Sequence, residues 1–352
     1  MINIGINGFG RIGKCLFLQL LDDPQCNIAN LKIRNFDINL LENYLKYDSI
    51  HRYNKLINIE LISDNLIKIN RHTIKILNEE DPFDEDIYLL DATGAFLTTE
   101  KCLQHKVKLV IMSSPPKDNT PSFVYGANHL KYNNEPVISA SSCTTNCLAP
   151  LLQLLNEKYI IDNCHFTTIH ASTSSQPTLD NLYFRSVYNN IIPYTTGASK
   201  CIIDIIPGLE DKIYGTSVRV PVNNCSLLDI NIEFRSACSL DDIKSDLIKH
   251  ELYKINNFSL VSSDFITTDK FYIDTSSMDT GLSKVKLMVW YDNEWSYSAQ
   301  MIRMVKYINS INSINSINSN APLTPSKMPR RKILHMYKNI YRNRPILSRV
   351  FC

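Results

Sequence analysis

Cys143 is a candidate nucleophile because of the residues on either side of it. It stands among small hydroxyl residues, after an extended apolar segment at residues 136–138 and before a helix-like apolar run at residues 148–155. At such a junction, unpaired N–H groups and the positive end of the helix favour thiolate over thiol, and a thiolate is a nucleophile. The alternative is an inert cysteine packed in the core. A catalytic role therefore depends on what the rest of the chain supplies.

His170 is the candidate base. It ends an alternating apolar segment and opens a hydroxyl-rich loop at residues 171–176. A histidine in this place can reach a thiolate and move a proton, although a surface or core histidine is the alternative. A turn at residues 195–197 offers hydroxyl and N–H groups to an anion, and Arg219 is a charge in an apolar strand that needs a partner or a ligand. Together these residues suit the oxidation of a phosphorylated aldehyde.

A dinucleotide fingerprint stands close to the N-terminus. Gly8, Gly10 and Gly13 form a GxGxxG between a predicted strand at residues 2–7 and a predicted helix at residues 12–21. Gly8 allows the tight turn, Gly10 lets the backbone approach a pyrophosphate, and Gly13 allows close packing of helix on strand. The N-terminus of the helix then faces the phosphates. The alternative is a glycine turn in another kind of βα unit.

The residues after the second predicted strand, at residues 31–36, bear on the choice of cofactor. Asp37 follows this strand, and a carboxylate there binds the adenosine ribose and repels the 2′-phosphate of NADP. Arg34 could instead attract that phosphate, but alternation along the strand would turn it away from its neighbour Asn35. The sequence therefore favours NAD, with NADP as the less favoured cofactor.

The composition is that of a globular protein of about two domains, with 352 residues, 44% of them apolar and 20% charged. The ten cysteines show no CxxC pair, which predicts a reducing compartment rather than a disulfide framework. The chain shows no signal peptide pattern and no apolar run long enough to span a bilayer, so we expect a cytoplasmic protein. No metal site is expected.

Periodicity predicts an α/β protein with two different sheets. Up to Cys143, short strands alternate with helical segments, which is typical of parallel βαβ units. Longer alternating segments after it predict a mixed or antiparallel sheet, with helices at residues 241–253 and 298–307. Residues 308–320 repeat Ile-Asn-Ser four times, a period that fits neither helix nor strand, and predict a low-complexity linker. The tail at residues 321–352, with eight Lys or Arg and no acid, is predicted to be disordered.

Three long motifs make the chain similar to the phosphorylating glyceraldehyde-3-phosphate dehydrogenases along nearly all of residues 1–307. They read INGFGRIG at residues 6–13, SCTTNCLAP at residues 142–150 and WYDNEWSYS at residues 290–298. The resemblance implies a Rossmann-type dinucleotide-binding domain, residues 1–143 with 298–311, and an α+β catalytic domain with a mixed or antiparallel sheet, residues 144–297. It also implies a homotetramer, and glyceraldehyde 3-phosphate and inorganic phosphate as substrates.

The resemblance assigns a role to each matching position. Cys143 would form a hemithioacetal and then a thioester, while His170 would act as base and hold the oxyanion with the Cys143 N–H. The cofactor would be bound by Asn7, Gly8, Gly10, Arg11, Ile12, Gly13, Asp37, Ser113 and Asn293. Thr173 and Arg219 would bind the phosphate of the substrate, and Ser142, Thr144, Thr196 and Gly197 the attacking phosphate.

The chain departs from the family pattern at three places. Asn35 is followed by Phe36 before Asp37, so either the strand bulges to present Asp37 or the ribose contact is lost. Glu80 stands near the adenine where the family commonly has Arg or Lys. The stretch at residues 178–185, which in the family belongs to a loop that packs across subunits, is short.

Two alternative functions stay open on the sequence. Erythrose-4-phosphate dehydrogenase shares the cysteine signature, although Thr173 and Thr196-Gly197 favour the glyceraldehyde 3-phosphate enzyme. A degenerate scaffold could instead bind nucleic acid or an anionic membrane through the tail, in which basic and aromatic residues are interleaved.

Overall fold

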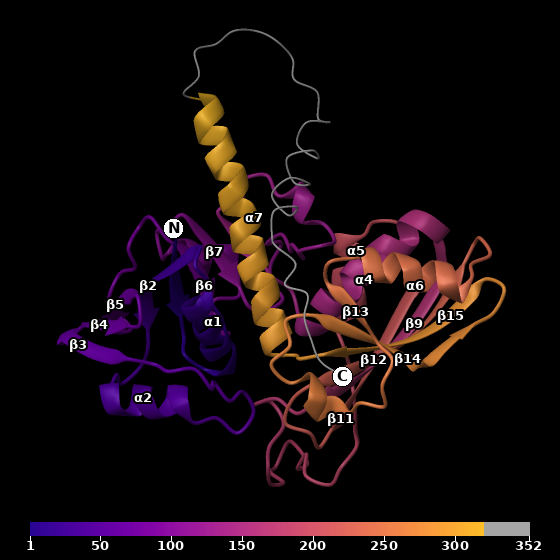
Figure 1. Cartoon of the computed structure of the whole chain (residues 1–352), viewed down its shortest axis with the longest axis horizontal. Helices are drawn as coiled ribbons and strands as arrows, with labels where there is room; N and C mark the ends of the chain where they lie inside the picture. Colours follow the sequence, from indigo (N-terminus) through magenta and orange to yellow (C-terminus); the bar gives the residue numbers. More distant parts are fainter. Residues whose placement is uncertain (320–352) are drawn as a thin grey trace, which may run out of the picture. The chain divides into compact units, whose positions relative to one another are not determined.

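The computed structural model describes residues 1–319, and the first half of the chain builds an eight-stranded sheet around buried isoleucines and leucines (Figure 1). Its strands lie in the order β3 (Ile59–Ser63), β4 (Leu66–Ile69), β5 (His72–Leu77), β2 (Cys26–Lys32), β1 (Ile2–Asn7), β6 (Tyr88–Asp91), β7 (Leu109–Met112) and β8 (Val137–Ser139). The strands from β5 to β8 pair in parallel, whereas β3 and β4 add an antiparallel edge. Parallel pairing needs crossover connections, which explains the alternation of strands and helices in the sequence.

The helices of this half are α1 (Arg11–Asp22), α2 (Ile38–Lys46) and α3 (Thr99–Leu103), with a short 3₁₀ turn, η1 (His129–Lys131). The first of them starts directly after the glycine-rich loop that follows β1. Leu16, Leu20 and other apolar residues of α1 are fully buried in the same core as β1 and β2. The parallel order of β2, β1 and β6 brings the loops after these strands to one edge of the sheet, where ligands bind in such folds.

The second half of the chain forms a seven-stranded mixed sheet with its own core. Its strands lie in the order β10 (Ile192–Tyr194), β11 (Ile213–Val220), β9 (Ile161–Ala171), β12 (Ser226–Phe234), β15 (Lys284–Tyr291), β14 (Phe271–Thr280) and β13 (Tyr253–Asn256). The helices α4 (Cys143–Tyr159), α5 (Ala198–Ile205) and α6 (Leu240–Lys249) lie along one face of this sheet, and η2 (Ser262–Phe265) is a short 3₁₀ turn (Figure 1). Alternating burial along β9 and β12 matches the periodicity of the sequence.

The last described helix, α7 (Trp295–Ser319), begins right after the Asp292–Glu294 segment. Its first turns contribute Met301, Val305 and Ile308 to the core of the eight-stranded sheet. The helix continues through the Ile-Asn-Ser repeat as far as Ser319, so the prediction of a non-helical linker is wrong for residues 308–319. Isoleucine at every third position drifts around a helix of 3.6 residues per turn, so Ile308 is buried while Ile314 is exposed. Backbone hydrogen bonds extend the helix from its packed first turns into the repeat, and this explains why the repeat is helical although it has no apolar face.

Two further boundaries differ from the sequence predictions. The strand predicted at residues 31–36 is wrong, because β2 ends at Lys32 and residues 34–35 form a turn in which Asn35 has a φ of 51°. Asparagine tolerates this left-handed conformation better than most residues. The helix predicted at residues 241–253 is shorter, because α6 ends at Lys249 and Tyr253 opens β13. The predictions for Asn320 and for residues 321–352 lie outside the described residues.

Among the residues that the structure describes, no helix combines the length and the apolar character needed to cross a bilayer. The described cysteines, in the same range, are all free thiols.

Candidate active site

Cys143 is the first residue of α4, so the helix begins five residues before the apolar run at residues 148–155 that indicated it. Hydrogen bonds hold the turn before Cys143. Ser142 caps the helix, since its Oγ accepts a hydrogen bond from the Thr145 N–H at 3.2 Å. Ser141 has a φ of 59°, which costs energy in a residue other than glycine. The Tyr297 hydroxyl donates to the Ser141 carbonyl oxygen at 2.9 Å. The thiol therefore sits at a strained and well-supported junction between strand and helix.

His170 lies near the end of β9, and its ring meets the thiol. Its Nε2 is 3.3 Å from the Cys143 Sγ, although the two residues are 27 positions apart in the chain. Its Nδ1 is 2.7 Å from the Ala171 carbonyl oxygen. When Nδ1 carries the ring proton and donates it to this carbonyl, Nε2 can accept the proton of the thiol. The structure thus brings the predicted nucleophile and the predicted base together.

The resting pair is a thiol and a neutral imidazole. Burial raises the pKa of the Cys143 thiol, whereas Arg219 and the N–H groups of Cys143 and Thr144 act in the opposite direction. Burial is the larger effect, so the pKa of the thiol is raised, whereas the sequence favoured thiolate at this helix start. Burial and, to a smaller extent, the nearby Arg219 charge together lower the pKa of His170 to about 4. His170 is therefore unprotonated at pH 7 and is available as a base.

Arg219 stands beside His170 because β11 and β9 are parallel neighbours in which these two residues are paired. Its Nη1 donates to the Ala171 carbonyl oxygen at 3.0 Å and lies 2.6 Å from the His170 Nδ1. Because arginine only donates, this second contact places the ring proton on Nε2. Nε2 accepts the thiol proton in the other tautomer, in which Nδ1–H donates to Ala171 and the guanidinium has moved away from Nδ1. The Arg219 Nε is buried and has no hydrogen-bond partner among the described residues. A buried donor without a partner suits an anionic ligand, because such groups are normally satisfied in folded proteins. This agrees with the phosphate site predicted for Arg219.

The loops that follow β9 and β10 carry hydroxyl groups. Thr173 is exposed, and its Oγ1 is 2.9 Å from the Ser175 Oγ. Gly197 is the residue before α5, and Thr196 supports this helix start because its Oγ1 accepts a hydrogen bond from the Ala198 N–H at 3.2 Å. The helix start presents N–H groups of the kind that bind anions.

Thr144 differs from the other predicted phosphate ligands because its hydroxyl is buried. It lies 3.1 Å from the Tyr291 hydroxyl, which is also 2.7 Å from the Thr168 Oγ1. This chain of three hydroxyls links α4, β15 and β9 behind Cys143. Sequence reasoning missed the roles of Thr168 and Tyr291. The only signal was that Tyr291 lies in the WYDNEWSYS motif, which does not tell a buried hydroxyl from an apolar core ring.

A cleft of about 1490 Å³ lies beside the glycine-rich loop and is lined by Asn7, Gly8, Gly10 and Asp37 among the predicted cofactor residues. Gly8 has a φ of 90°, and a Cβ on Gly13 would lie 2.1 Å from the Gly8 carbonyl oxygen. At Gly10 a Cβ would meet nothing within 4 Å. The loop therefore needs its glycines for the turn and for helix packing, and leaves open space where a diphosphate has to approach. These residues fit a dinucleotide.

Asp37 caps α2 and also lines the cleft. Its Oδ1 accepts hydrogen bonds from the Asn39 and Leu40 N–H groups at 2.8 and 3.4 Å. The turn at residues 34–35, rather than a bulged strand, thus brings this carboxylate to the cleft. Arg34 also lines the cleft and is ion-paired with Glu79. The cation in reach of a 2′-phosphate is thus already paired with a carboxylate.

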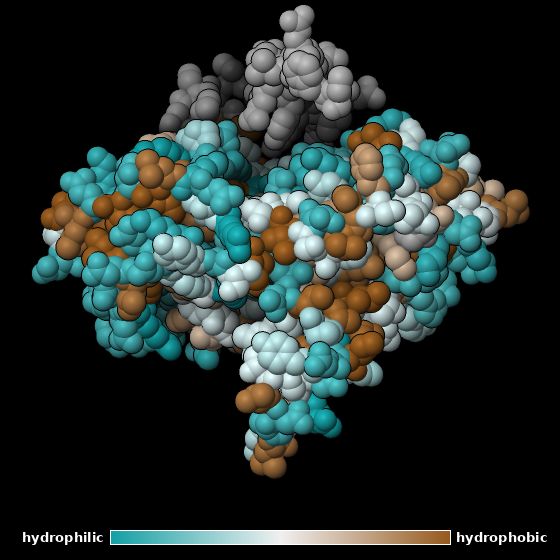
Figure 2. All heavy atoms as spheres, turned by 60° about the horizontal axis from the view of Figure 1, so that its bottom comes forward, coloured by the Kyte–Doolittle hydropathy of each residue, from teal (hydrophilic) through white to brown (hydrophobic). Residues whose placement is uncertain are grey.

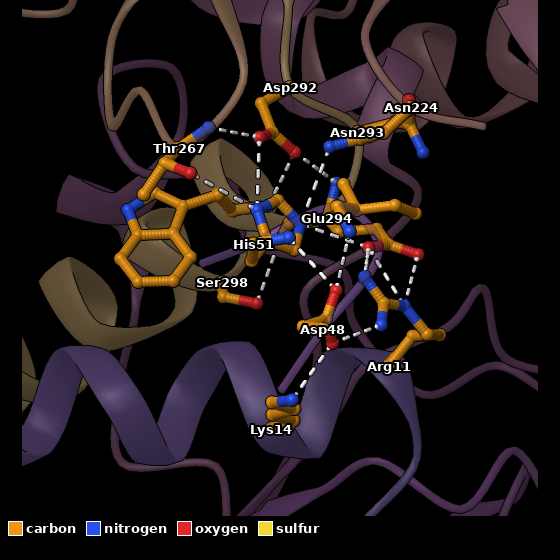
Figure 3. Close-up of polar contacts among 12 residues, drawn as sticks. Arg11, Lys14, Asp48, His51, Asn224, Thr267, Asp292, Asn293, Glu294 and Ser298 are labelled. Atoms are coloured by element: carbon orange, nitrogen blue, oxygen red, sulfur yellow. Dashed lines mark hydrogen bonds and ion pairs between the residues drawn. The ribbon is translucent and has the colours of Figure 1, made fainter. Parts of the chain in front are cut away.

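The remaining predicted cofactor residues, Arg11, Ile12, Gly13, Ser113 and Asn293, lie outside the lining of this cleft. The Arg11 side chain donates to Asp48 at 2.6 Å and to Glu294 at 2.8 Å, so it holds protein segments together (Figure 3). The Asn293 Oδ1 accepts a hydrogen bond from the Ser226 Oγ at 2.9 Å. Sequence reasoning gave no role to Asp48, His51 or Glu294, although Glu294 lies in the WYDNEWSYS motif.

Family models match both halves of the chain. Residues 2–99 match the model described as glyceraldehyde 3-phosphate dehydrogenase, NAD binding domain. Residues 142–293 match the model described as glyceraldehyde 3-phosphate dehydrogenase, C-terminal domain. The two matches divide between the eight-stranded and the seven-stranded sheets.

Curated relatives extend the similarity over most of the chain. A glyceraldehyde-3-phosphate dehydrogenase of Bacteroides fragilis is 36% identical over 324 residues, which cover 85% of this chain and 96% of the relative. The cytosolic enzyme of that name from Leishmania mexicana is 35% identical and covers 86% of this chain and 97% of its own length. Glyceraldehyde-3-phosphate dehydrogenase 2 of Bacillus subtilis is 33% identical, covering 86% of this chain and 95% of the relative. These matches do not favour either alternative function.

Proposed function

Because the chain belongs to the glyceraldehyde-3-phosphate dehydrogenase family, we propose that Cys143 and His170 carry out the chemistry of that reaction here. The protein is an NAD-dependent oxidoreductase that converts glyceraldehyde 3-phosphate and inorganic phosphate into 1,3-bisphosphoglycerate. The observation that carries the proposed roles is the 3.3 Å contact between the Cys143 Sγ and the His170 Nε2 at the start of α4. It supplies a nucleophile and a base in one place.

In the first half-reaction, the Cys143 sulfur attacks the aldehyde carbon while its proton passes to the His170 Nε2. The developing oxyanion is held by the protonated imidazole and by the Cys143 N–H. NAD, when bound, accepts the hydride that leaves the same carbon. His170 then releases its proton, and Cys143 carries a thioester. A neutral His170 is required for the first step, and its lowered pKa of about 4 supports this.

In the second half-reaction, an oxygen of inorganic phosphate attacks the thioester carbon and the Cys143 sulfur leaves. We assign the substrate phosphate to Thr173 and Arg219, whose buried Nε lacks a partner among the described residues. The attacking phosphate is assigned to Ser142, Thr196 and Gly197 at two helix starts. For Thr144 we propose its backbone N–H, because the hydroxyl already contacts Tyr291.

NAD is the cofactor of the family, and we propose how this chain holds it. Gly8, Gly10 and the start of α1 would receive the diphosphate, with Asn7 beside them. Asp37 would bind the adenosine ribose with the carboxylate oxygen that is not used as a helix cap. The shape of the glycine-rich loop would be supported by residues outside the lining of the cleft, namely Arg11, Ile12, Gly13 and Ser113. Asn293 would hold the nicotinamide carboxamide.

We further propose that the protein forms a homo-oligomer, by resemblance a tetramer. The loop between β9 and β10 exposes a group of large apolar side chains, namely Leu179, Leu182, Tyr183, Phe184, Tyr188 and Ile191. The surface in Figure 2 carries hydrophobic patches among its polar residues. Apolar groups of this kind are characteristic of interfaces between proteins. Replacing Leu182, which is 88% exposed, by Asp should lower the mass measured by light scattering, whereas Leu282→Asp, 87% exposed in another turn, should not.

The remaining proposals concern the domains and the compartment. We propose that residues 1–143 with 298–311 form the dinucleotide-binding domain and residues 144–297 the catalytic domain, because the two sheets have separate cores. A cytoplasmic location is supported by the free thiols of the described residues and by the cytosolic relative from Leishmania mexicana.

The experiment that tests the proposed function is turnover by the Cys143→Ser variant. We expect no phosphate-dependent NADH formation from glyceraldehyde 3-phosphate, with NAD binding preserved because Cys143 lies outside the cofactor cleft. Cys147→Ser, one helical turn further along α4, is the matched control and should keep activity. Full turnover by the Cys143 variant would refute the mechanism.

A further inference from the structure

A buried polar cluster surrounds His51 and reaches the segment that carries Asn293 (Figure 3). We call it the His51 cluster and define it by His51 and the charged residues around it, Arg11, Lys14, Asp48, Asp292 and Glu294. These residues come from α1, from the segment after α2 and from the turn between β15 and α7. His51 has no role in the reaction described above. It is nevertheless buried among charged groups, with only 1% of its surface exposed.

The His51 ring is bracketed by two carboxylates of the turn before α7. Its Nε2 is 3.0 Å from the Glu294 Oε2, and its Nδ1 is 3.7 Å from the Asp292 Oδ2. Thr267 and Asn224 add polar contacts at 3.4 and 3.3 Å to the two ring nitrogens. Both ring nitrogens thus face partners that belong to the second half of the chain.

The backbone around His51 is held just as firmly from the nucleotide side. The Asp48 Oδ1 accepts hydrogen bonds from the Ile50 and His51 N–H groups at 2.8 and 2.9 Å. Its Oδ2 receives the Arg11 guanidinium at 2.6 Å and the Lys14 ammonium at 2.8 Å. The segment that carries His51 is therefore pinned to α1.

The turn at Asp292 and Glu294 is equally well supported and contains Asn293 between them. The Asp292 carboxylate accepts hydrogen bonds from the N–H groups of Thr267, Glu294 and Trp295 at 2.7 to 2.9 Å. Only 5% of Asn293 is exposed, and its Oδ1 is bonded to Ser226. A shift of either flanking carboxylate would therefore turn the Asn293 amide.

The charges of the cluster give the His51 ring an electrostatic role in addition to packing. The cluster contains two cations and three carboxylates. The cations are Arg11 and Lys14, and the carboxylates are those of Asp48, Asp292 and Glu294. Removing one partner from a buried charged network leaves charges without compensation, and the segment that carries them relaxes toward water. His51 is the group in contact with both carboxylates that flank Asn293.

We propose that His51 is a positioning residue for the oxidation step: it fixes the turn at residues 292–294 and so orients the Asn293 amide for the nicotinamide ring. This inference rests on the proposed role of Asn293. It does not assign His51 any contact with cofactor or substrate. It predicts a defect confined to the nicotinamide end of the cofactor, because the His51 ring contacts the carboxylates on either side of Asn293, whereas Gly8, Gly10 and Asp37 are assigned to the other parts of the cofactor.

The test compares the binding of NAD with that of ADP-ribose, which lacks the nicotinamide, to the full-length protein by calorimetry. The variant His51→Gln should weaken NAD binding about tenfold, the loss of one hydrogen bond, and change ADP-ribose binding less than about twofold. The value of kcat should fall with it. His165→Gln, an exposed histidine on β9, is the control and should change neither.

A double variant separates this inference from the proposed function. Asn293→Ala should show the same selective loss of NAD binding, and adding His51→Gln to it should cost little more, because both act through one contact. Equal weakening of NAD and ADP-ribose by His51→Gln would overturn the positioning role. No selective loss in Asn293→Ala would instead refute the proposed role of Asn293. Should His51→Gln fail to fold, Glu294→Gln provides the same comparison and should give the same pattern.

Discussion

The two ends of the site are built differently. At the chemical end, Cys143 and His170 lie at the start of α4 and near the end of β9, so regular elements with buried faces determine their separation. At the adenosine end, Asp37 follows a turn at residues 34–35 and serves as a helix cap as well as lining the cleft. The separation of Cys143 and His170 is thus set by regular elements, whereas the second end depends on a few loop residues. Substitutions should therefore act on rate at one end and on cofactor choice at the other.

Among the substitutions that test this difference between the two ends, His170→Asn is expected to have the largest effect. Without a base near Sγ, the rate of NADH formation should fall roughly ten- to ten-thousandfold while the KM for NAD stays nearly unchanged. Steady-state kinetics with glyceraldehyde 3-phosphate measures both quantities. His165→Asn on the same strand is the control, and a large rise in the KM for NAD would mean that the two ends are not independent.

Asp37→Ser should produce the opposite pattern. Serine keeps the helix cap but removes the carboxylate, so NAD should bind roughly ten- to a hundredfold more weakly while the stability of the protein changes little. The preference for NAD over NADP should shrink with it. Asp37→Ala should lose about 1 kcal/mol of stability in addition. Unchanged NAD affinity in Asp37→Ser would mean that Asp37 is only a helix cap.

Arg219→Gln should move the pH dependence at the chemical end. A nearby cation disfavours the protonated imidazole, so removing it raises the pKa of His170 from about 4. The acid limb of kcat/KM, where protonated His170 can no longer accept the thiol proton, should shift up by about one pH unit. Unphosphorylated glyceraldehyde is the substrate to use, because it does not need the phosphate site. The exposed Arg235→Gln should leave the profile in place.

The smallest effect is expected from Glu79→Gln, which frees Arg34. Exposed ion pairs contribute little, so kcat/KM with NADP should rise only about two- to fivefold, and that with NAD should stay the same. Glu42→Gln, which breaks an exposed pair with Lys46 in α2, is the control. A rise with both cofactors would point to a general change of the cleft rather than to recognition of the 2′-phosphate.

Much of the fold could be predicted from the sequence, because burial of one face of a helix or strand gives its apolar residues a regular spacing. The strand predicted at residues 2–7 and the helix predicted at residues 12–21, on either side of the GxGxxG, agree with β1 and α1 to within a residue. The helical repeat at residues 308–319 could not be predicted, because it has no apolar face and extends a helix that is packed elsewhere. The end of β2 at Lys32 depends on a turn at Asn35 rather than on any apolar pattern.

Site residues that lie in a sequence motif could be predicted. The contacts of a residue with distant segments of the chain could not. Cys143 could be placed at a helix start because small hydroxyl residues precede an apolar run. The resting thiol could not be predicted, since it depends on how deeply the sulfur is buried. The pairing of Arg11 with Glu294 joins residues 283 positions apart, and no local pattern reports it.

The most direct test of the central claim is the time course of NADH formation by the wild-type protein after mixing with NAD and glyceraldehyde 3-phosphate in the absence of phosphate. If Cys143 carries a thioester, one NADH per active site should form in a burst and then stop, and added phosphate should restart turnover. Steady NADH formation at the same rate with and without phosphate would contradict the thioester at Cys143.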